Sequence, residues 1–365
     1  MASETVDLRP LARSVAPSRP RGRARGRRLL LPVCLIVLVG AAVLTATSLG
    51  PSDTGPALTL VILLEPARPA LEAVGIDLPA PSAAATSLVW SIRLPRVLLA
   101  LVVGGGLGAA GLVMQAVFRN PLADPGVTGV SSGAAVVAVL LIVTGLATPV
   151  TLPLGAFLGA LGAVMVVQLV AGLRGGGGGT LLLVGIAMNS LLGAVIAAAI
   201  ANAPASDDAQ AAMFWLNGDL TGATWSDVAV AVVPGILGIT VLLGTAGELN
   251  LFLLGEDQAA STGMRTGRTR QILLAISAVV IAAGVCVTGV IGFVGLVVPH
   301  LARLLLGPDH RVLLPVSVLV GGVFLVLADV IARNLLDPVT LQTGTVTALV
   351  GAPVLLALIC RRSGR

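Results

Sequence analysis

The stretch LPRVLLALVVGGGLGAAGLVMQAV, Leu94 to Val117, decides the fold class of this chain. It is almost wholly apolar, and it has the length of about 20 residues that a helix needs to cross a bilayer. The whole chain shares this character: of its 365 residues 56% are apolar and only 11% are charged, and the mean hydropathy is +1.03. Such values are typical of a membrane protein and not of a soluble domain. The sequence therefore predicts an all-α polytopic membrane protein.

Outward from this stretch, the chain divides into ten apolar runs, each a candidate transmembrane helix. The eighth is the doubtful one, because it is short and contains Pro299 and His300. Small residues four apart, at Gly104 and Gly108 and again at Gly155 and Gly159, predict close packing between helices. The runs cover 29–49, 94–117, 126–146, 150–173, 180–203, 226–246, 271–290, 292–306, 311–333 and 343–360.

The arginines predict how the chain is oriented. Eight of the 22 lie between Arg9 and Arg28, directly before the first run, as in a membrane-orienting cluster and not a nucleic-acid-binding face. With ten crossings and a cytoplasmic N-terminus, eighteen arginines lie inside and four outside, namely Arg68, Arg93, Arg96 and Arg333. Without the eighth crossing, Arg311, Arg361, Arg362 and Arg365 would also lie outside. We therefore expect cytoplasmic tails at 1–28 and 361–365 and a transmembrane domain at 29–360.

The same N-terminal region permits a second interpretation, a twin-arginine export signal. Its apolar stretch from Leu29 to Leu49 is longer than the roughly 7 to 15 residues of a signal core. A retained spanning helix is therefore favoured.

The chain offers little of the chemistry that enzymes use. It contains no lysine, so the glycine run at 172–180 cannot be a phosphate-binding P-loop and is predicted to be a cytoplasmic turn. The two histidines lie ten residues apart without neighbouring ligands, and the three cysteines lack metal-binding spacing. The sequence predicts no catalytic residues, no metal site and no cofactor held by this chain.

Polar residues inside the apolar runs are few and therefore informative. They are Gln115, Gln168, Asn189, Ser190 and Asp329. Asp329 lies four positions before Arg333, which is the spacing of an ion pair on one helix face. Two interpretations stay open for this acid: a local ion pair that holds a helix end, or the coupling site of an ion-driven carrier.

The segment 246–270, AGELNLFLLGEDQAASTGMRTGRTR, is too polar to span a membrane. Its apolar patch, the acidic GED and the closing Gly263 predict one or two short helices on the membrane surface. Such helices could dock a soluble partner or simply lie at the interface.

Several stretches in order resemble the FecCD-type permeases of bacterial ABC importers, which carry iron-siderophores, haem or cobalamin. The resemblance runs from about Arg93 to Pro353, whereas the first 90 residues offer no specific match. The stretches that carry it are RLPRVLLALVVGGGLGAAGLVMQAVFRNPLADPGVTGVSSGA, LLLVGIAMNSLLGAVI, LNLFLLGEDQAASTGM, GVIGFVGLVVPHLARLLLGPDHRVLLPVSVLVGGVFLVLADVIAR and TALVGAP.

The resemblance implies a permease subunit of the bacterial plasma membrane, paired around a central path with a second copy or a paralogous chain. It also implies two ABC ATPase subunits, which hold the ATP and magnesium, and one extracytoplasmic substrate-binding protein. Among the family's cargoes an iron-siderophore is preferred as the commonest, with cobalamin or haem as alternatives.

It further implies roles for particular residues. The family's ATPase-coupling helices match Leu254 to Met264, with Gly255, Glu256, Ala259 and Gly263 as the positions carried over. Arg93, Arg96 and Arg333 match arginines that dock the binding protein, although they could merely anchor helix ends at the headgroups. The translocation path and its gate match Met188, Asn189, Ser190, Asn120 and Leu122, although Asn120 and Pro121 could simply form a turn.

The chain departs from the family pattern at two places. The loop before the fifth run is a glycine run, so gate residues cannot be carried over to it. Thr340 and Gln342 stand where the family commonly has an acid and a proline before TAL, which leaves the outer end of the last run without a template.

Overall fold

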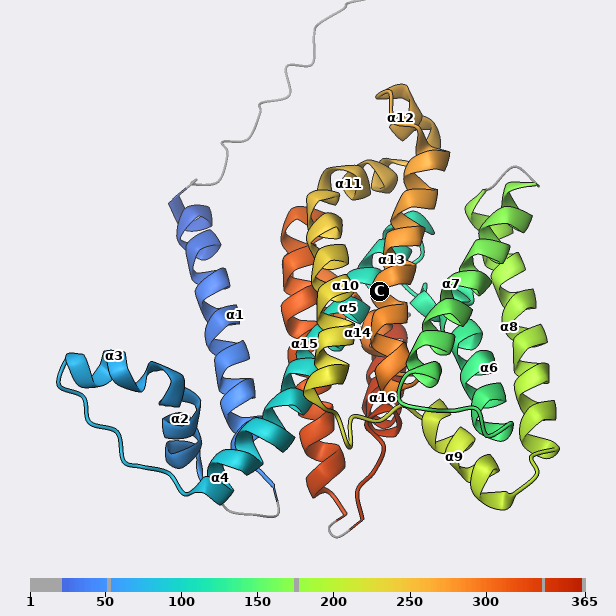
Figure 1. Ribbon diagram of the computed structural model, residues 1–365. Coiled ribbons are helices and arrows are strands. Elements are labelled where there is room, and N and C mark those ends of the chain that lie inside the picture. Colours follow the sequence, from blue (N-terminus) through green and yellow to red (C-terminus); the bar gives the residue numbers. More distant parts are fainter. Residues whose placement is uncertain (1–21, 51–53, 174–176, 337–338, 363–365) are drawn as a thin grey trace, which may run out of the picture.

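Helix α5 (Leu94–Val117) begins and ends where the apolar run does and lies at the centre of the helical bundle (Figure 1). The computed structural model describes residues 22–50, 54–173, 177–336 and 339–362. Nearly every side chain of α5 is buried by its neighbours. A single-pass helix would face lipid all round, so this burial makes α5 the core element of a polytopic bundle.

Glycines let α5 contact its neighbours backbone to backbone. A Cβ placed on Gly104 would overlap the carbonyl oxygen of Gly321, and one on Gly108 would overlap that of Ser317, both on α15 (His310–Asn334). The predicted packing role of the small residues is confirmed here and again at Gly159, whose Cβ would overlap the carbonyl of Gly133 in the next hairpin. At these glycines the backbones of α5 and α15 therefore meet directly.

All ten apolar runs form helices. Seven helical stretches are long and apolar enough to cross a membrane, and three shorter apolar helices accompany them, within the described ranges. The long ones are α1 (Gly22–Ser48), the stretch Ala83–Val117 that ends in α5, α7 (Thr151–Gly172), α8 (Gly178–Ala201), α10 (Trp225–Gly244), α13 (Thr266–Thr288) and α15. The short ones are α6 (Val130–Val143), α14 (Val294–Leu306) and the apolar part, Thr343–Leu358, of α16 (Thr343–Arg362). The number of actual crossings stays a prediction.

The residues just before α5 are helical as well. Helix α4 (Ala83–Ser87) runs into a π-helical turn, η2 (Leu88–Arg93), which continues into α5. The N–H of Leu94 donates to the carbonyl of Val89, five residues back. Pro95 follows directly and has no N–H to donate, and the wide turn accommodates this interruption without breaking the helix.

A short helical excursion follows α1. It comprises α2 (Pro56–Leu64), η1 (Glu65–Ala67) and α3 (Arg68–Ala73), and it lies to the side of the bundle next to α1 (Figure 1). Arg68 holds it together, because its guanidinium pairs with Glu65 at 2.8 Å and donates to the carbonyl of Leu78 at 2.8 Å. Residues 22–28, predicted as part of the tail, form the first turns of α1, and 1–21 lie outside the described residues.

The segment 246–270 contains two short helices, α11 (Ala246–Leu254) and α12 (Glu256–Ser261), as predicted. They lie at the same end of the bundle as the start of α1, whereas α4 and α9 (Ser206–Leu216) lie at the opposite end (Figure 1). We call these the inner and outer ends, following the orientation that the arginines predict. The 3₁₀ turn η3 (Pro125–Thr128) connects α5 to α6.

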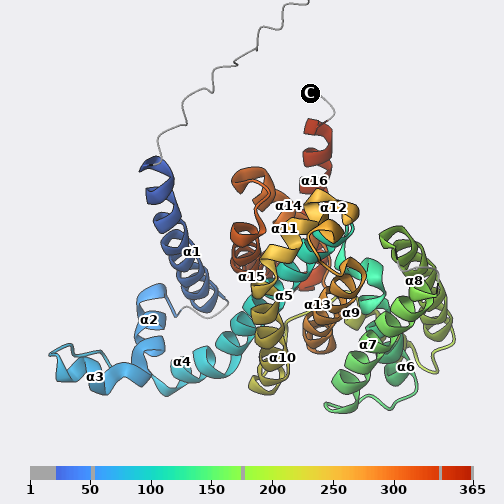
Figure 2. The same cartoon turned by 90° about the horizontal axis from the view of Figure 1, so that it is seen from above.

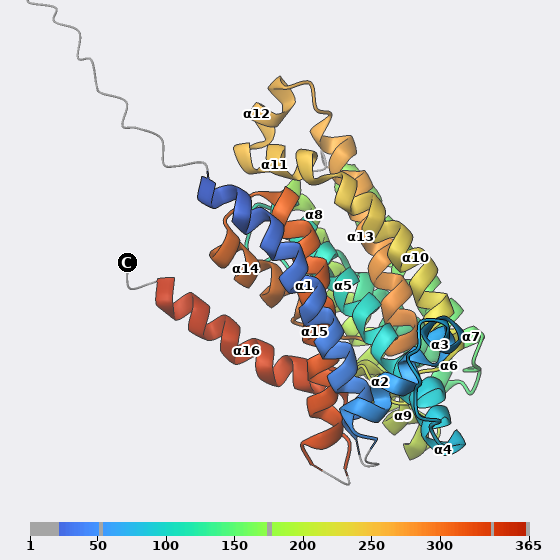
Figure 3. The ribbon, with the colours of Figure 1, turned by 90° about the vertical axis from the view of Figure 1, so that its left-hand side faces the viewer.

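Two helices lie at the periphery of the bundle. Viewed from above, α1 and α8 occupy opposite sides (Figure 2), and in the side view α16 runs obliquely away from the core (Figure 3). Only 11% of the apolar window of α8 is buried inside the chain, against 83% for the stretch that includes α5. Much of α8 is therefore available to lipid or to another chain.

Candidate functional site

The outer end holds a buried cluster of charged side chains. The Arg96 guanidinium contacts Asp329 through Nη2 at 2.7 Å and Nε at 2.9 Å, and Arg333 Nε lies 3.3 Å from the same carboxylate. Thr343 on α16 donates to Asp329 at 3.1 Å. The predicted pair between Asp329 and Arg333 is confirmed, and the shorter contact with Arg96 joins α5 to α15.

Two of the arginines also bind the end of α1. Arg93 Nη1 donates to the carbonyls of Thr47 and Ser48 at 2.8 and 3.0 Å, and Arg333 Nη2 donates to that of Ala46 at 2.9 Å. The last carbonyls of a helix lack partners within the helix and carry partial negative charge. We call Arg93, Arg96, Arg333 and Asp329 the outer arginine cluster; it connects α1, α5, α15 and α16.

The three arginines that the sequence assigns to docking are thus turned inward. Arg93, Arg96 and Arg333 are 4%, 8% and 9% exposed. Each makes contacts within the chain, and a docking partner would meet them only by reaching into the cluster. Their role in docking stays a prediction, while their contacts with α1 and the contact of Arg96 with Asp329 are a structural role that the sequence did not reveal.

At the inner end, Gly255 forms the turn between α11 and α12. Its φ of 108° and ψ of 157° lie in a region that residues with a side chain hardly enter, and the Arg119 guanidinium lies beside it. Glu256 forms an ion pair with Arg270 at the start of α13. Ala259 is buried, whereas Glu256 and Gly263 are exposed. Of the four positions carried over from the family, only the side chain of Glu256 and the main chain of Gly263 are therefore accessible to a partner.

A second contact at the inner end involves Asn250 on α11, which the sequence analysis did not single out. Its Oδ1 accepts from the backbone N–H of His310 at 2.9 Å, and its Nδ2 donates to Asp309 Oδ1 at 2.9 Å. Asp309 in turn caps α15 by accepting from the N–H of Arg311 at 3.0 Å. The hydrogen bond from Asn250 holds the pKa of Asp309 below its ordinary value. The N-cap pattern of Asp309 was readable from the sequence, but its partner 59 positions earlier was not.

The residues predicted for the path divide into two groups. Asn189 on α8 faces inward, donating to the carbonyl of Gly126 at 3.1 Å and accepting from Ser132, and Met188 is half-buried beside it. Ser190 is exposed on α8, and Leu122 is 43% exposed. Asn120 accepts from the N–H of Leu122 at 2.9 Å, which is the turn that the sequence also allowed. Their role in a path stays a prediction.

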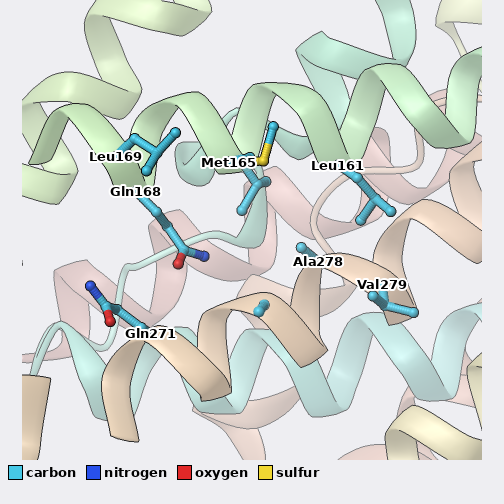
Figure 4. Close-up of a pocket in the computed structure, with 9 residues that line it drawn as sticks. Leu161, Met165, Gln168, Leu169, Gln271, Ala278 and Val279 are labelled. Carbon is cyan, nitrogen blue, oxygen red and sulfur yellow. The ribbon is translucent and has the colours of Figure 1, made fainter. Parts of the chain in front are cut away.

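The other polar residues of the apolar runs lie between helices. Gln115 donates to the carbonyl of Leu296 at 3.1 Å and so joins α5 to α14. Gln168 extends from α7 into a groove of about 370 Å³ against α13, where Gln271 extends from the opposite wall (Figure 4). The rest of this groove is apolar. Among the described residues, no group of three or more His, Cys, Asp or Glu side chains could hold a metal ion.

A bundle of apolar helices with its charged residues gathered at two ends defines a polytopic membrane protein of the permease class. The model of the FecCD transport family matches residues 33–361, nearly the whole chain. The chain belongs to the FecCD transport family. It is a permease of an ABC importer and a multi-pass protein of the inner membrane.

Individual relatives agree with this assignment. The chain is 43% identical over 337 residues to the cobalamin import system permease protein of Halobacterium salinarum, covering 91% of this chain and 87% of the relative. It is 44% identical over 284 residues to the hemin transport system permease protein of Yersinia pestis, covering 75% and 84%. A solved ABC transporter described as of the metal-chelate type, in an inward-facing conformation, matches with a TM-score of 0.77 and 28% identity over 90% of this chain and 98% of that one.

Proposed function

We propose that this permease imports an iron-siderophore, driven by ATP hydrolysis on a separate subunit. The observation that carries the proposal is the family match over residues 33–361, together with relatives that are named for cobalamin, hemin and Fe(3+)-citrate. Iron is supported by relatives from Bacillus subtilis named as an iron-uptake permease and an Fe(3+)-citrate permease, each 35% identical. The relatives named for cobalamin and hemin are more similar, so these two cargoes are the second candidates.

The partners follow from the two ends of the molecule. One ATPase subunit would bind at α11 and α12 of each permease, two in all, because this surface is exposed at the end that the arginine distribution places inside. A chain without lysine has no P-loop of its own. A second permease, either a copy or a paralogue, would cover α8, which buries little of its surface within the chain.

An extracytoplasmic binding protein would dock on the outer arginine cluster. Three arginines surround one acid there, so the cluster carries a net positive charge that suits acidic side chains.

Charge reversal tests the docking role. Arg93→Glu should weaken association with the binding protein at low salt, whereas Arg68→Glu, at the same end but outside the cluster, should not. Equal affinity of both variants and the parent would count against docking at the cluster.

The path would run along α8, past Ser190, towards Leu122 and Asn120 at the inner end. Met188 and Asn189 would shape this wall from behind, since their side chains contact η3 and α6. A bulky Ser190→Trp should therefore obstruct uptake, and an unimpaired rate in an assembled transporter would remove this assignment.

An ion-coupled carrier that uses Asp329 is the competing function. The contacts of Asp329 speak against it, because two guanidiniums and a hydroxyl occupy the carboxylate.

Uptake into proteoliposomes decides between these functions and among the cargoes. The permease is reconstituted with its ATPase and binding protein, and uptake of a ferric siderophore, cobalamin and haem is measured with an active or a catalytically inactive ATPase. We expect ATP-dependent uptake of the siderophore that uncouplers do not abolish. Uptake that persists with the inactive ATPase would refute an ATP-driven importer, and preference for cobalamin or haem would replace only the cargo.

A further inference from the structure

The Asn250 side chain joins the segment 246–270, which we call the coupling segment, to the first turn of α15. It uses both halves of its amide: the oxygen accepts from His310 N–H and lies 2.9 Å from His310 Nδ1, and the nitrogen donates to Asp309. An amide offers an acceptor oxygen and a donor nitrogen on two separate atoms. An ionised carboxylate has no donor, and a hydroxyl has only one oxygen atom for both roles. We call this contact the Asn250 bridge.

Helix α15 leads from this bridge to the outer arginine cluster. His310 begins the helix and Asp329 lies 19 residues later, which is about 29 Å at 1.5 Å per residue. Pro315 interrupts the hydrogen bonding near the inner end, but Leu313 and Leu314 are fully buried there and fix this turn in place. One helix therefore carries a contact of the coupling segment at one end and the acid of the cluster at the other.

Helix α5 reinforces this connection along its length. Its glycines contact the α15 backbone at Ser317 and Gly321, and interfaces packed this closely shift as rigid units because few rotamers can absorb a displacement. At the outer end Arg96 of α5 binds Asp329, and at the inner end Arg119 lies beside Gly255. At the inner end, the turn after α5 and the first turn of α15 thus contact the coupling segment. At the outer end, both helices contribute residues to the outer arginine cluster.

We propose that Asn250 is a positioning residue that transmits movement of α11 through the α5 and α15 pair to the outer arginine cluster. The inference rests on the proposed function, in which an ATPase binds α11 and α12 and a binding protein binds the arginines. Movement of α11 pulls on the first turn of α15 through the Asn250 bridge, and the rigid pair carries it to Asp329. In the opposite direction, a movement caused by docking of the binding protein at the arginines is transmitted to the ATPase through the same contacts.

The experiment exchanges the two polar partners of the bridge. Asn250→Asp alone sets two carboxylates against each other. Combined with Asp309→Asn, it restores a donor opposite an acceptor in the bridge but not the cap of α15, because Asp309 Oδ1 accepts from both Asn250 and Arg311. Asn250→Ala removes the bridge without adding charge, and Asn202→Ala on α8, whose amide bonds only within its own helix, is the matched control.

The readout is the stimulation of ATP hydrolysis by loaded binding protein in proteoliposomes, expressed as the ratio of stimulated to basal rate for each variant. Uptake per ATP hydrolysed is measured alongside, and copurification with the ATPase confirms assembly. Coupling free energies of ordinary size correspond to changes of about 5-fold or more. We expect the ratio to fall by about that factor in Asn250→Ala and Asn250→Asp, and to recover in part in the exchanged double variant, which regains the bridge without the cap.

Three outcomes overturn the inference. An unchanged ratio in Asn250→Ala removes the role of the bridge, and failure of the double variant to recover shows that hydrogen bonding between these partners is not what matters. An equal loss in Asn202→Ala shows that the effect is unspecific. If the parent transporter shows no stimulation by any loaded binding protein, the proposed function fails instead.

Discussion

Asp329→Asn tests how far the outer arginine cluster depends on its single acid. Asp329 is 1% exposed and contacts Arg96, Arg333 and Thr343 at 2.7 to 3.3 Å. An amide of the same shape removes the negative charge and leaves two buried guanidiniums side by side. Removal of one partner from a buried ion pair typically costs about 3–5 kcal/mol, which is two to nearly four orders of magnitude in the folding equilibrium.

The matched control is Thr343→Val, which removes one neutral donor from the same carboxylate. A hydrogen bond of this kind contributes about 0.5–1.5 kcal/mol, or up to about 3 kcal/mol when its partner is charged. The assay is heat-induced loss of monodisperse protein in detergent, compared at one heating rate because such transitions are often irreversible. We expect the midpoint of Asp329→Asn to fall well below those of Thr343→Val and the parent.

A third variant separates lost charge from lost packing. Replacing the trio together, with Arg96→Met, Asp329→Leu and Arg333→Met, removes all its charges, and substitutions of this kind are often neutral or stabilising. The triple variant should therefore recover most of the stability that Asp329→Asn loses. If Asp329→Asn is no less stable than Thr343→Val, the carboxylate is not what holds the cluster together.

Three further predictions concern other parts of the fold. Gly255→Ala should destabilise the turn between α11 and α12 by about 1–3 kcal/mol, because the backbone geometry of Gly255 is nearly restricted to glycine. The amount of ATPase that copurifies with this variant should therefore fall, and an amount equal to that of the parent would contradict the prediction. Gly321→Leu should lower the thermal midpoint, since even a Cβ overlaps the Gly104 carbonyl and overpacking costs about 1–3 kcal/mol, whereas Gly162→Ala, with open space around it, should not. Arg68→Ala should expose residues 74–82 to protease. The hydrogen bond from Arg68 lowers the pKa of Glu65. The ion pair therefore contributes its full stability at any pH above the ordinary glutamate pKa of about 4.3, and this stability is lost only as the pH falls through the lowered pKa of Glu65. Protection of the parent from protease should accordingly be the same at pH 8 and pH 5.

The helical spans were predictable because each is a long apolar run. The prediction of 94–117 coincides with α5, and the doubtful eighth run does form a short helix, α14. The pair of Asp329 and Arg333 was predictable for a similar reason, since four positions on one helix bring two side chains together. Local patterns thus supplied both the elements and the contacts within them.

What the sequence could not supply were contacts between distant positions. Arg96 and Asp329 are 233 positions apart, and Asn250 and His310 are 60 apart; no periodicity links them. The inward direction of the arginines was missed for the same reason, because the carbonyls of α1 that they bind carry no mark in the sequence. Helices such as α3 and α9 were missed because they are short and partly polar, so that packing and not composition determines them.

The separation of Arg96 from Asp329 also sets an order for biosynthesis. At 5 to 20 residues per second, the ribosome reaches Asp329 roughly 10 to 50 s after Arg96 has been made. During that interval Arg96 lacks the carboxylate that it binds in the folded bundle. The ion pair that joins α5 to α15 is therefore completed late in synthesis, after the ninth apolar run has been made.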